Sequence, residues 1–262
     1  MTSVIYYFSG TGNSLHIARS IARQIPDVKL VNIACHSDVS DKIEADCIGL
    51  VFPVHFGDMP VTAERFARKM KLTGSPYVYA IATCGAGMPG NTLTNLDRLL
   101  RKNGARLSAG FALAMPDNAY TGMNLITPPE QRAGILEASE RRLAEIIEVI
   151  RRKETVGISG KGATAGRFVM PVMKLVVTRG FRVQKGFRAT DQCSGCGICK
   201  KICPAGNISV EDKTVTWGGR CTLCLACFHW CPQQAVQLDG KTEKIARYHH
   251  PQVAIEDMAC TR

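Results

Sequence analysis

Eight of the twelve cysteines occur in two copies of one pattern. Each copy reads C-x2-C-x2-C-x3-C-P, and Cys221 opens the second copy 28 positions after Cys193 opens the first. The match extends past the cysteines, because Ile208 and Val236 stand at the same offset. The full set is Cys193, Cys196, Cys199 and Cys203 before Pro204, and Cys221, Cys224, Cys227 and Cys231 before Pro232. An internal repeat of this kind indicates one duplicated metal-binding unit more strongly than either copy alone.

The spacing of the cysteines has a chemical reason. Three cysteines two residues apart wrap a tight loop whose thiolates converge on three irons of one 4Fe-4S cluster. A zinc ribbon would use paired C-x2-C units, which leaves the third and fourth cysteines of each copy unexplained. Disulfides are the other alternative. The spacing favours two 4Fe-4S clusters, and eight iron-bound thiolates predict a reducing compartment and a cytoplasmic location.

Residues 187–238 resemble the bacterial two-cluster ferredoxins. In those proteins the fourth cysteine of each copy, just before proline, ligates the other cluster. The resemblance implies the following two ligand sets. One cluster has Cys193, Cys196, Cys199 and Cys231, and the second has Cys221, Cys224, Cys227 and Cys203.

The N-terminal segment has the pattern of a phosphate site. Val4 to Phe8 is a short apolar run that predicts a buried strand, and Ser14 to Gln24 has the apolar spacing of a helix. Between them stand Ser9, Gly10, Thr11, Gly12, Asn13 and Ser14. Such a loop offers hydroxyls, and the backbone N–H groups at a helix start attract anions. It is neither a Walker A loop nor a G-x-G-x-x-G fingerprint. Taken alone, this loop could equally be a turn that binds no ligand.

The elements that follow favour the phosphate site. Further strands are predicted at 28–33, 47–52, 77–83 and 107–115, and helices at 61–71, 91–102 and 130–153. Alternating strands and helices predict a doubly wound parallel α/β sheet. Ligands of such sheets bind beyond the carboxyl ends of the strands. The loops at these ends are 53–60, 83–90 and 116–120.

Residues 1–155 resemble a flavodoxin, with strand order 2-1-3-4-5 and a loop that resembles the cradle for the phosphate of flavin mononucleotide (FMN). The resemblance implies that residues 9–14 bind the phosphate. It also implies that the isoalloxazine ring lies between two loops. One is Pro53, Val54, His55, Phe56 and Gly57; the other is Thr83, Cys84, Gly85, Ala86 and Gly87. The whole chain resembles the flavodoxin–ferredoxin fusion proteins of anaerobes, which share an M-P-x-N motif, and this implies a cofactor role for Asn118.

Several features of the flavin loops leave alternatives open. Residues 84–90 contain no aromatic side chain, so one flavin face is open unless Tyr120 covers it; His55 and Phe56 could cover the other. Gly57 could flip its peptide to bind the reduced flavin, or could serve only the turn, which we favour.

We expect structural roles for the remaining cysteines and no metal site at the histidine pair. Lone cysteines are usually small packing residues, and we expect this of Cys35, Cys47, Cys84 and Cys260, although Cys84 could be a redox thiol. His249 and His250 have no third metal ligand nearby in sequence, so metal binding is not expected there.

The sequence predicts four segments: a flavodoxin-like domain 1–155, a basic connector 156–186, the ferredoxin domain 187–238, and a polar tail 239–262 that lies back on one of the domains. Much of the net charge of +11 falls in and beside the connector. This charge is either simply solvated or a docking face for an acidic redox protein, such as a ferredoxin or an oxidoreductase, or for an anionic membrane surface. No nucleic-acid motif accompanies it. Residues 168–177 predict a short helix between the domains or, alternatively, a peripheral membrane anchor.

Clusters carry one electron at a time, whereas a flavin holds two, so joining them in one chain predicts electron transfer. We expect an oxidoreductase of anaerobic metabolism that passes electrons between an external low-potential donor, the two clusters and FMN. No acid, base or nucleophile stands out as a catalytic residue. A flavin-dependent reductase of a quinone, free flavin or nitro compound is the alternative, and a redox-sensing partner-binding module is a third. The oligomeric state is not predicted.

Overall fold

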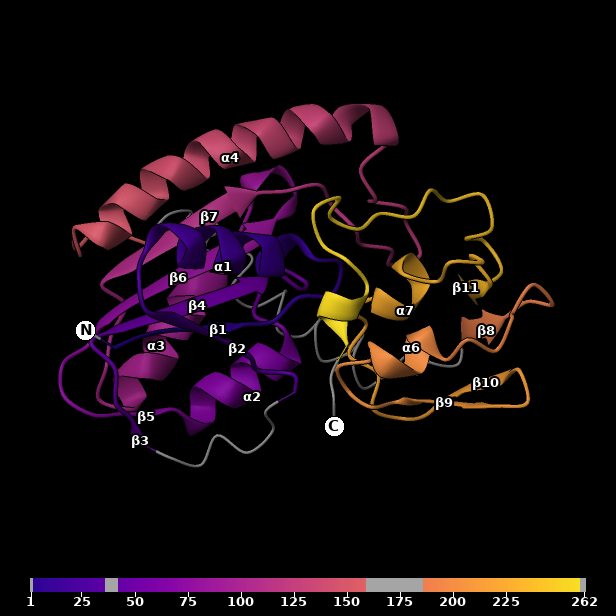
Figure 1. The fold of residues 1–262 in the computed structure, drawn as a ribbon, viewed down its shortest axis with the longest axis horizontal. Helices are drawn as coiled ribbons and strands as arrows, with labels where there is room; N and C mark the ends of the chain where they lie inside the picture. The colour runs from indigo at the N-terminus through magenta and orange to yellow at the C-terminus, as the bar shows by residue number, and fades with distance from the viewer. Residues whose placement is uncertain (1, 36–41, 159–185, 260–262) are drawn as a thin grey trace.

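The computed structural model describes residues 2–35, 42–158 and 186–259. A larger N-terminal unit and a smaller C-terminal unit lie side by side, and the C-terminal tail runs along their junction (Figure 1). The strands of the larger unit point their carboxyl ends toward the smaller one (Figure 1). The predicted ligand-binding edge of the sheet therefore faces the cysteine-rich unit.

The larger unit is built on a five-stranded parallel sheet. Its strands are β1 (Ser3–Tyr7), β2 (Val28–Asn32), β4 (Cys47–Pro53), β6 (Tyr77–Cys84) and β7 (Ala109–Ala114), in the order β2-β1-β4-β6-β7. This order is the predicted 2-1-3-4-5 arrangement, so the flavodoxin-like fold is confirmed. Every residue of β6 is buried, as expected for a central strand covered on both faces.

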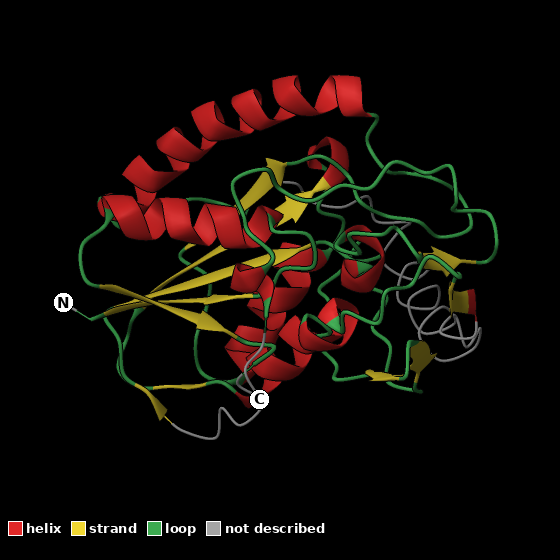
Figure 2. Ribbon diagram, turned by 45° about the vertical axis from the view of Figure 1, so that its right-hand side comes forward, coloured by secondary structure: helices red, strands yellow, loops and turns green. Residues whose placement is uncertain are grey.

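Helices cover both faces of the sheet (Figure 2). Helices α1 (Asn13–Gln24) and α4 (Pro129–Arg151) pack on one face, with Ile17, Ile21 and Leu143 in a common core with the sheet. Helices α2 (Val61–Lys69) and α3 (Thr92–Lys102) pack on the other face. The apolar stripe of α4 supplies Leu143, Ile146, Ile147 and Ile150, all buried as the periodicity predicts.

One small feature was not predicted. Strand β3 (Lys42–Ile43) pairs in parallel with β5 (Lys71–Leu72), outside the main sheet. The predicted helix 61–71 therefore ends at Lys69, because Lys71 extends to pair with Lys42.

The smaller unit repeats one pattern twice. The first copy contains β8 (Phe187–Ala189), α6 (Ile198–Lys201) and β9 (Ile208–Glu211); the second contains β10 (Thr214–Trp217), α7 (Ala226–His229) and β11 (Val236–Leu238). The pairing crosses between the copies, since β8 pairs with β11 and β9 with β10. Ile208 and Val236, matched in the sequence repeat, each begin a strand.

The basic connector falls mostly outside the described residues, and so do the predicted helix and anchor at 168–177. Within the described ranges, no helix is long and apolar enough to cross a membrane.

Candidate cofactor sites

The first group of cysteines lines a pocket in the smaller unit. Cys193, Cys196 and Cys199 of the first copy share its wall with Cys231 of the second, as the crossed ligand assignment requires. Apolar side chains complete the lining, among them Ile198, Val210 and Val236. Cys196 is exposed. We call this the outer cysteine group, and its four thiols in a partly apolar pocket fit a 4Fe-4S cluster.

The second group is Cys203 with Cys221, Cys224 and Cys227, and we call it the inner cysteine group. Burial raises the pKa of Cys224 to about 12, and negative charge on Cys203 and Cys221 acts in the same direction. Burial also raises the pKa of Cys227 well above its usual value, and charge on Cys224, Cys221 and Cys203 adds to this. The four thiols are therefore mutual neighbours. Thiolates crowded together in a partly buried site need a metal cation, which fits the second cluster.

The loop between β1 and α1 has the donors that a phosphate needs. Among the described residues, the backbone N–H groups of Gly10, Thr11, Asn13 and Ser14 have no acceptor. Thr11 and Ser14 are each only 1% exposed. Gly12 caps the helix with φ of 96°, a conformation that glycine adopts readily. Buried N–H groups are normally satisfied, so this cluster of free donors at a helix start fits an anionic ligand.

Side chains from the other strand ends fix the shape of this loop. Ser14 and Thr83 share a hydrogen bond of 2.9 Å between their hydroxyl oxygens. The Asn13 amide donates to the Pro116 carbonyl at 3.2 Å, and the Asn118 amide donates to the Thr11 hydroxyl. The fold thus brings together residues of the predicted phosphate loop, the second flavin loop and the M-P-x-N motif.

The first predicted flavin loop contacts the second and also the residues just after it. The Val54 backbone N–H donates to the Thr83 carbonyl at 2.9 Å. The Gly57 carbonyl accepts a hydrogen bond of 2.8 Å from the Asn91 backbone N–H, and Gly90 packs so closely that an added Cβ would lie 2.3 Å from that carbonyl oxygen. Because the Gly57 carbonyl already has a donor, a peptide flip would break this bond, and the geometry favours the turn role. Phe56 and Ala86 both have positive φ, 52° and 49°, a strain typical of ligand-binding loops.

The aromatic side chains are distributed unevenly around these loops. Tyr120 is 6% exposed and belongs to the same hydrophobic cluster as Phe228, in the core of the smaller unit. His55 lies edge-on to Phe8, with ring centres 6.1 Å apart. Ala86 and Met88 of the second loop are exposed. No aromatic side chain stands on the second loop itself.

The phosphate loop also forms the junction with the smaller unit. The Trp230 indole donates to the Gly10 carbonyl at 3.0 Å. A Cβ added at Gly10 would lie 2.7 Å from the carbonyl oxygen of Cys224, a member of the inner cysteine group. The inner group and the candidate phosphate loop are therefore in direct backbone contact.

The C-terminal tail closes the same junction. The Tyr248 hydroxyl donates to the Asn13 side chain at 2.6 Å, and the His250 backbone N–H donates to the Thr11 carbonyl at 2.8 Å. Arg19 forms a double contact with Asp257 at 2.6 Å. The tail lies on both units, where the sequence predicted only one. The clustered aromatic residues of the tail and of α7 are the sequence feature from which the contact of the tail with both units could have been predicted.

His229 connects α7 to the M-P-x-N motif. Its Nδ1 accepts from the Tyr248 backbone N–H at 3.1 Å, so its Nε2 carries the proton that it donates to the Asn118 carbonyl at 2.9 Å. Burial lowers the pKa of His229 to about 3, so the ring is neutral. Asn118 in turn binds Thr11, which gives a continuous polar chain from α7 to the phosphate loop.

The lone cysteines have different environments. Cys47 and Cys84 are buried, which raises the pKa of Cys47 to about 11 and that of Cys84 to about 12, as expected of packing residues. The packing interpretation is wrong for Cys35, which is disulfide-bonded. Cys260 lies outside the described residues.

The fold supplies the third group that the sequence around His250 lacks. His16, Glu140 and His250 place their ligating atoms within 4.8 Å of one another. However, the two imidazole rings are stacked, with centres 3.9 Å apart and planes inclined by 17°. Nearly parallel rings at this spacing cannot both direct an in-plane nitrogen to one ion. His16 instead bonds Glu140 at 2.5 Å, and the cluster is a hydrogen-bonded contact between α1, α4 and the tail.

Comparison with known proteins supports the assignment of the smaller unit. Residues 192–236 match the family described as 4Fe-4S dicluster domain, so the cysteine repeat forms a domain of that type with two 4Fe-4S clusters. A stretch of 47 residues, 18% of this chain, is 45% identical to a subunit of the ion-translocating oxidoreductase complex of Methanosarcina acetivorans. That stretch spans only 18% of the curated relative.

Solved structures resemble the larger unit only distantly. A short-chain flavodoxin associated with a bacterial microcompartment has 19% identity and a TM-score of 0.38, over 58% of this chain and 97% of the other. The rubredoxin oxygen oxidoreductase of Desulfovibrio gigas has 16% identity and a TM-score of 0.36, over 58% of this chain and 36% of the other. Similarity at this level says nothing about activity.

Proposed function

We propose that this chain is an electron-transfer flavo-iron–sulfur protein of anaerobic metabolism. It passes electrons between an external low-potential donor, two 4Fe-4S clusters and FMN. The outer cysteine group holds one cluster and the inner group holds the other. Residues 9–14 hold the phosphate of FMN through the free N–H groups of Gly10, Thr11, Asn13 and Ser14, and the loops 53–57 and 83–87 flank its ring. The flavin, when bound, exchanges electrons in pairs, whereas each cluster exchanges one.

The contact between Cys224 and Gly10 carries this proposal. An added Cβ at Gly10 would lie 2.7 Å from the Cys224 carbonyl oxygen, so the inner cluster site and the phosphate loop share one interface. The outer group, by contrast, has an exposed cysteine, Cys196. This difference in position and exposure favours an order in which the external donor reduces the outer cluster and the inner cluster exchanges electrons with the flavin.

The partner we propose is an acidic redox protein. Lys200 and Lys201 are exposed on α6, beside the outer cysteine pocket, and Lys213 packs against Gly195 on the same rim. Basic side chains around an exposed redox centre steer an acidic partner to it. The relative in an ion-translocating oxidoreductase complex is compatible with exchange of electrons with a larger complex. A cytoplasmic location belongs to the same proposal.

The test is anaerobic preparation followed by quantitation of iron, sulfide and flavin. Rapid mixing with a reduced ferredoxin, followed at cluster and flavin wavelengths, should show bleaching of the clusters before that of the flavin. Cys203→Ser should remove the inner cluster and abolish fast flavin reduction while the outer cluster still bleaches. Cys47→Ser, at a buried thiol at the start of β4 and outside both cysteine groups and both flavin loops, is the matched control and should behave as the parent protein. Zinc in place of iron, or no flavin, would refute the proposal.

A flavin-dependent reductase of a small acceptor is the second candidate. The observation in its favour is the second flavin loop, where Ala86 is exposed, Met88 is 70% exposed and no aromatic ring is present. An open flavin face there would admit a quinone, a free flavin or a nitro compound. Saturable turnover with one of these acceptors would establish this function. A redox-sensing module, the third candidate, would show redox-dependent partner binding without turnover.

A further inference from the structure

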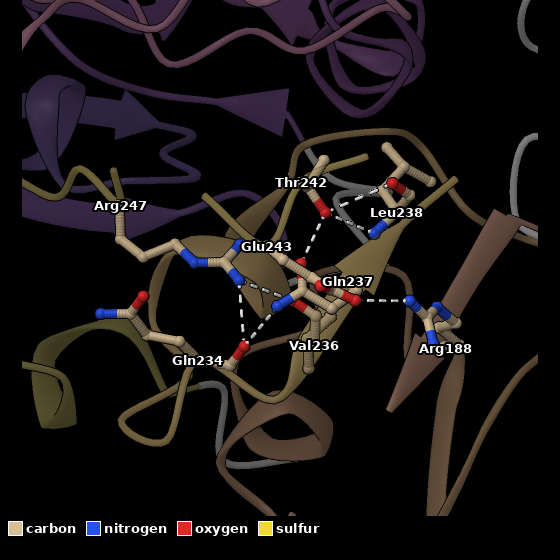
Figure 3. A network of polar contacts seen from close by, with 8 residues as sticks. All are labelled: Arg188, Gln234, Val236, Gln237, Leu238, Thr242, Glu243 and Arg247. Atoms are coloured by element: carbon tan, nitrogen blue, oxygen red, sulfur yellow. Dashed lines mark hydrogen bonds and ion pairs between the residues drawn. The ribbon is translucent and has the colours of Figure 1, made fainter. Parts of the chain in front are cut away.

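The C-terminal tail carries an arginine that is held firmly against the cluster-binding domain. The Nη2 atom of Arg247 donates to the carbonyl oxygens of Gln234 at 3.0 Å and Val236 at 2.9 Å (Figure 3). Its guanidinium carbon lies 3.3 Å from the centre of the Phe228 ring. In addition, the Arg247 carbonyl accepts a hydrogen bond of 2.9 Å from Arg132. These contacts fix the guanidinium between β11 and α7.

Part of this guanidinium has no partner. The Nε and Nη1 atoms of Arg247 are buried and have no acceptor among the described residues. Among the described residues, no carboxylate is among the groups whose charge shifts the pKa of Arg247. A buried cation without a counter-ion is costly, and the folded chain must supply a negative charge to compensate it.

The negative charges that act on Arg247 come from two cluster cysteines. Burial lowers the pKa of Arg247 to about 10, and the charges of Cys231 and Cys227 oppose this shift. Cys231 belongs to the outer cysteine group and Cys227 to the inner group. The geometry agrees, because Val236 lines the outer pocket beside Cys231 while Phe228 directly follows Cys227. Arg247 is thus shared between the two groups.

We propose that Arg247 is the common counter-cation of the two clusters and that its charge raises their reduction potentials. A cluster bound by four thiolates is anionic and becomes more so when it takes up an electron from the donor. A fixed positive charge nearby therefore favours the reduced form, and hydrogen-bond donors near the sulfurs act in the same direction. Arg247 is a positioning residue and not a ligand. This inference rests on the iron–sulfur part of the proposed function.

The test is a redox titration of the full-length, anaerobically prepared protein, with both clusters followed by electron paramagnetic resonance. Arg247→Gln removes the charge and should shift the reduction equilibrium of both clusters toward the oxidised form on the order of tenfold, about 59 mV for one electron. Arg247→Lys keeps the charge and should keep most of the potential. Arg188→Gln is the matched control, because Arg188 is 51% exposed and pairs with Glu243 at 2.8 Å in the same domain.

The outcomes separate this inference from the proposed function. Absence of clusters from the parent protein would refute both. Arg247→Gln with full iron and unchanged potentials would refute the counter-cation role and leave electron transfer intact. If Arg247→Gln loses iron, Arg247→Lys decides: clusters at nearly the parent potentials support the charge role. If Arg247→Lys loses iron as well, the counter-cation role is overturned, because the clusters then depend on the hydrogen bonds from Arg247 to Gln234 and Val236 and not on its charge.

Discussion

A single methyl group can test whether the two units depend on each other. Gly10 lies where the phosphate loop meets the inner cysteine group, and in Gly10→Ala the new Cβ would lie 2.7 Å from the Cys224 carbonyl oxygen. The obstacle is backbone, so it cannot move aside by a change of rotamer. The substitution keeps the Gly10 backbone N–H and the Gly10 carbonyl that binds Trp230. It therefore acts on the contact between the units more than on the phosphate site itself.

The expected size of the effect follows from the cost of overpacking. Forcing an extra carbon into a close-packed site costs about 1–3 kcal/mol. Trp230, Tyr248 and the tail still hold the junction, so the units should stay together in most molecules. A cost of this size nevertheless raises the fraction of molecules with an open junction by about 5- to 150-fold.

Native-state proteolysis of the cofactor-loaded protein measures that fraction, because cleavage tracks the open population when reclosing is fast. Gly10→Ala should be cut near the junction faster by the same factor, and should reduce its flavin more slowly from the clusters. Gly134→Ala is the control: it also adds one methyl group, but on α4 with nothing within 4 Å. Parent-like proteolysis and parent-like electron transfer in Gly10→Ala would refute the idea that this contact couples the two units.

Three further predictions follow from the same structure. Trp230→Phe leaves the Gly10 carbonyl without its hydrogen-bond donor. The free energy of unfolding in urea should therefore fall by about 1–3 kcal/mol, and an unchanged unfolding midpoint would contradict this. Cys231→Ser should remove the paramagnetic signal of the outer cluster, and Cys203→Ser that of the inner one; loss of the same signal in both variants would disprove the crossed assignment. Burial lowers the pKa of His250 from 6.5 to about 3, so the folded protein favours the neutral ring. The stabilisation that the neutral ring gives to the folded state is therefore complete above pH 6.5, and it is lost as the pH falls toward 3. Between about pH 7 and about pH 5 the free energy of unfolding should fall, with a slope from this group that approaches about 1.4 kcal/mol per pH unit. His250→Gln should abolish this part of the pH dependence.

Local patterns predicted most of the fold and indicated which cysteines are the candidate cluster ligands. The order of the main sheet follows from alternating strands and helices, because each element buries a face that its own periodicity defines. The cysteine spacing predicts the iron chemistry, because a thiolate must reach its iron from within one tight loop. The pairing of Cys231 with the first copy was implied by the resemblance to two-cluster ferredoxins, and the structure places Cys231 in the outer pocket. The short pairing of Lys42 with Lys71 was missed, because two-residue strands carry no periodicity.

The relation between the two halves was not readable from the sequence. Trp230 bonds Gly10, and Tyr248 bonds Asn13, across more than 200 positions of the chain. Arg247 reaches β11 because the tail lies back on that strand, where its side chain donates to the Val236 carbonyl. Such contacts depend on the complementary shape of the surfaces of the two units, and no spacing along the chain encodes them. The sequence by itself predicted which groups would hold iron and phosphate; the tertiary structure decided that the inner cysteine group and the candidate phosphate loop share an interface.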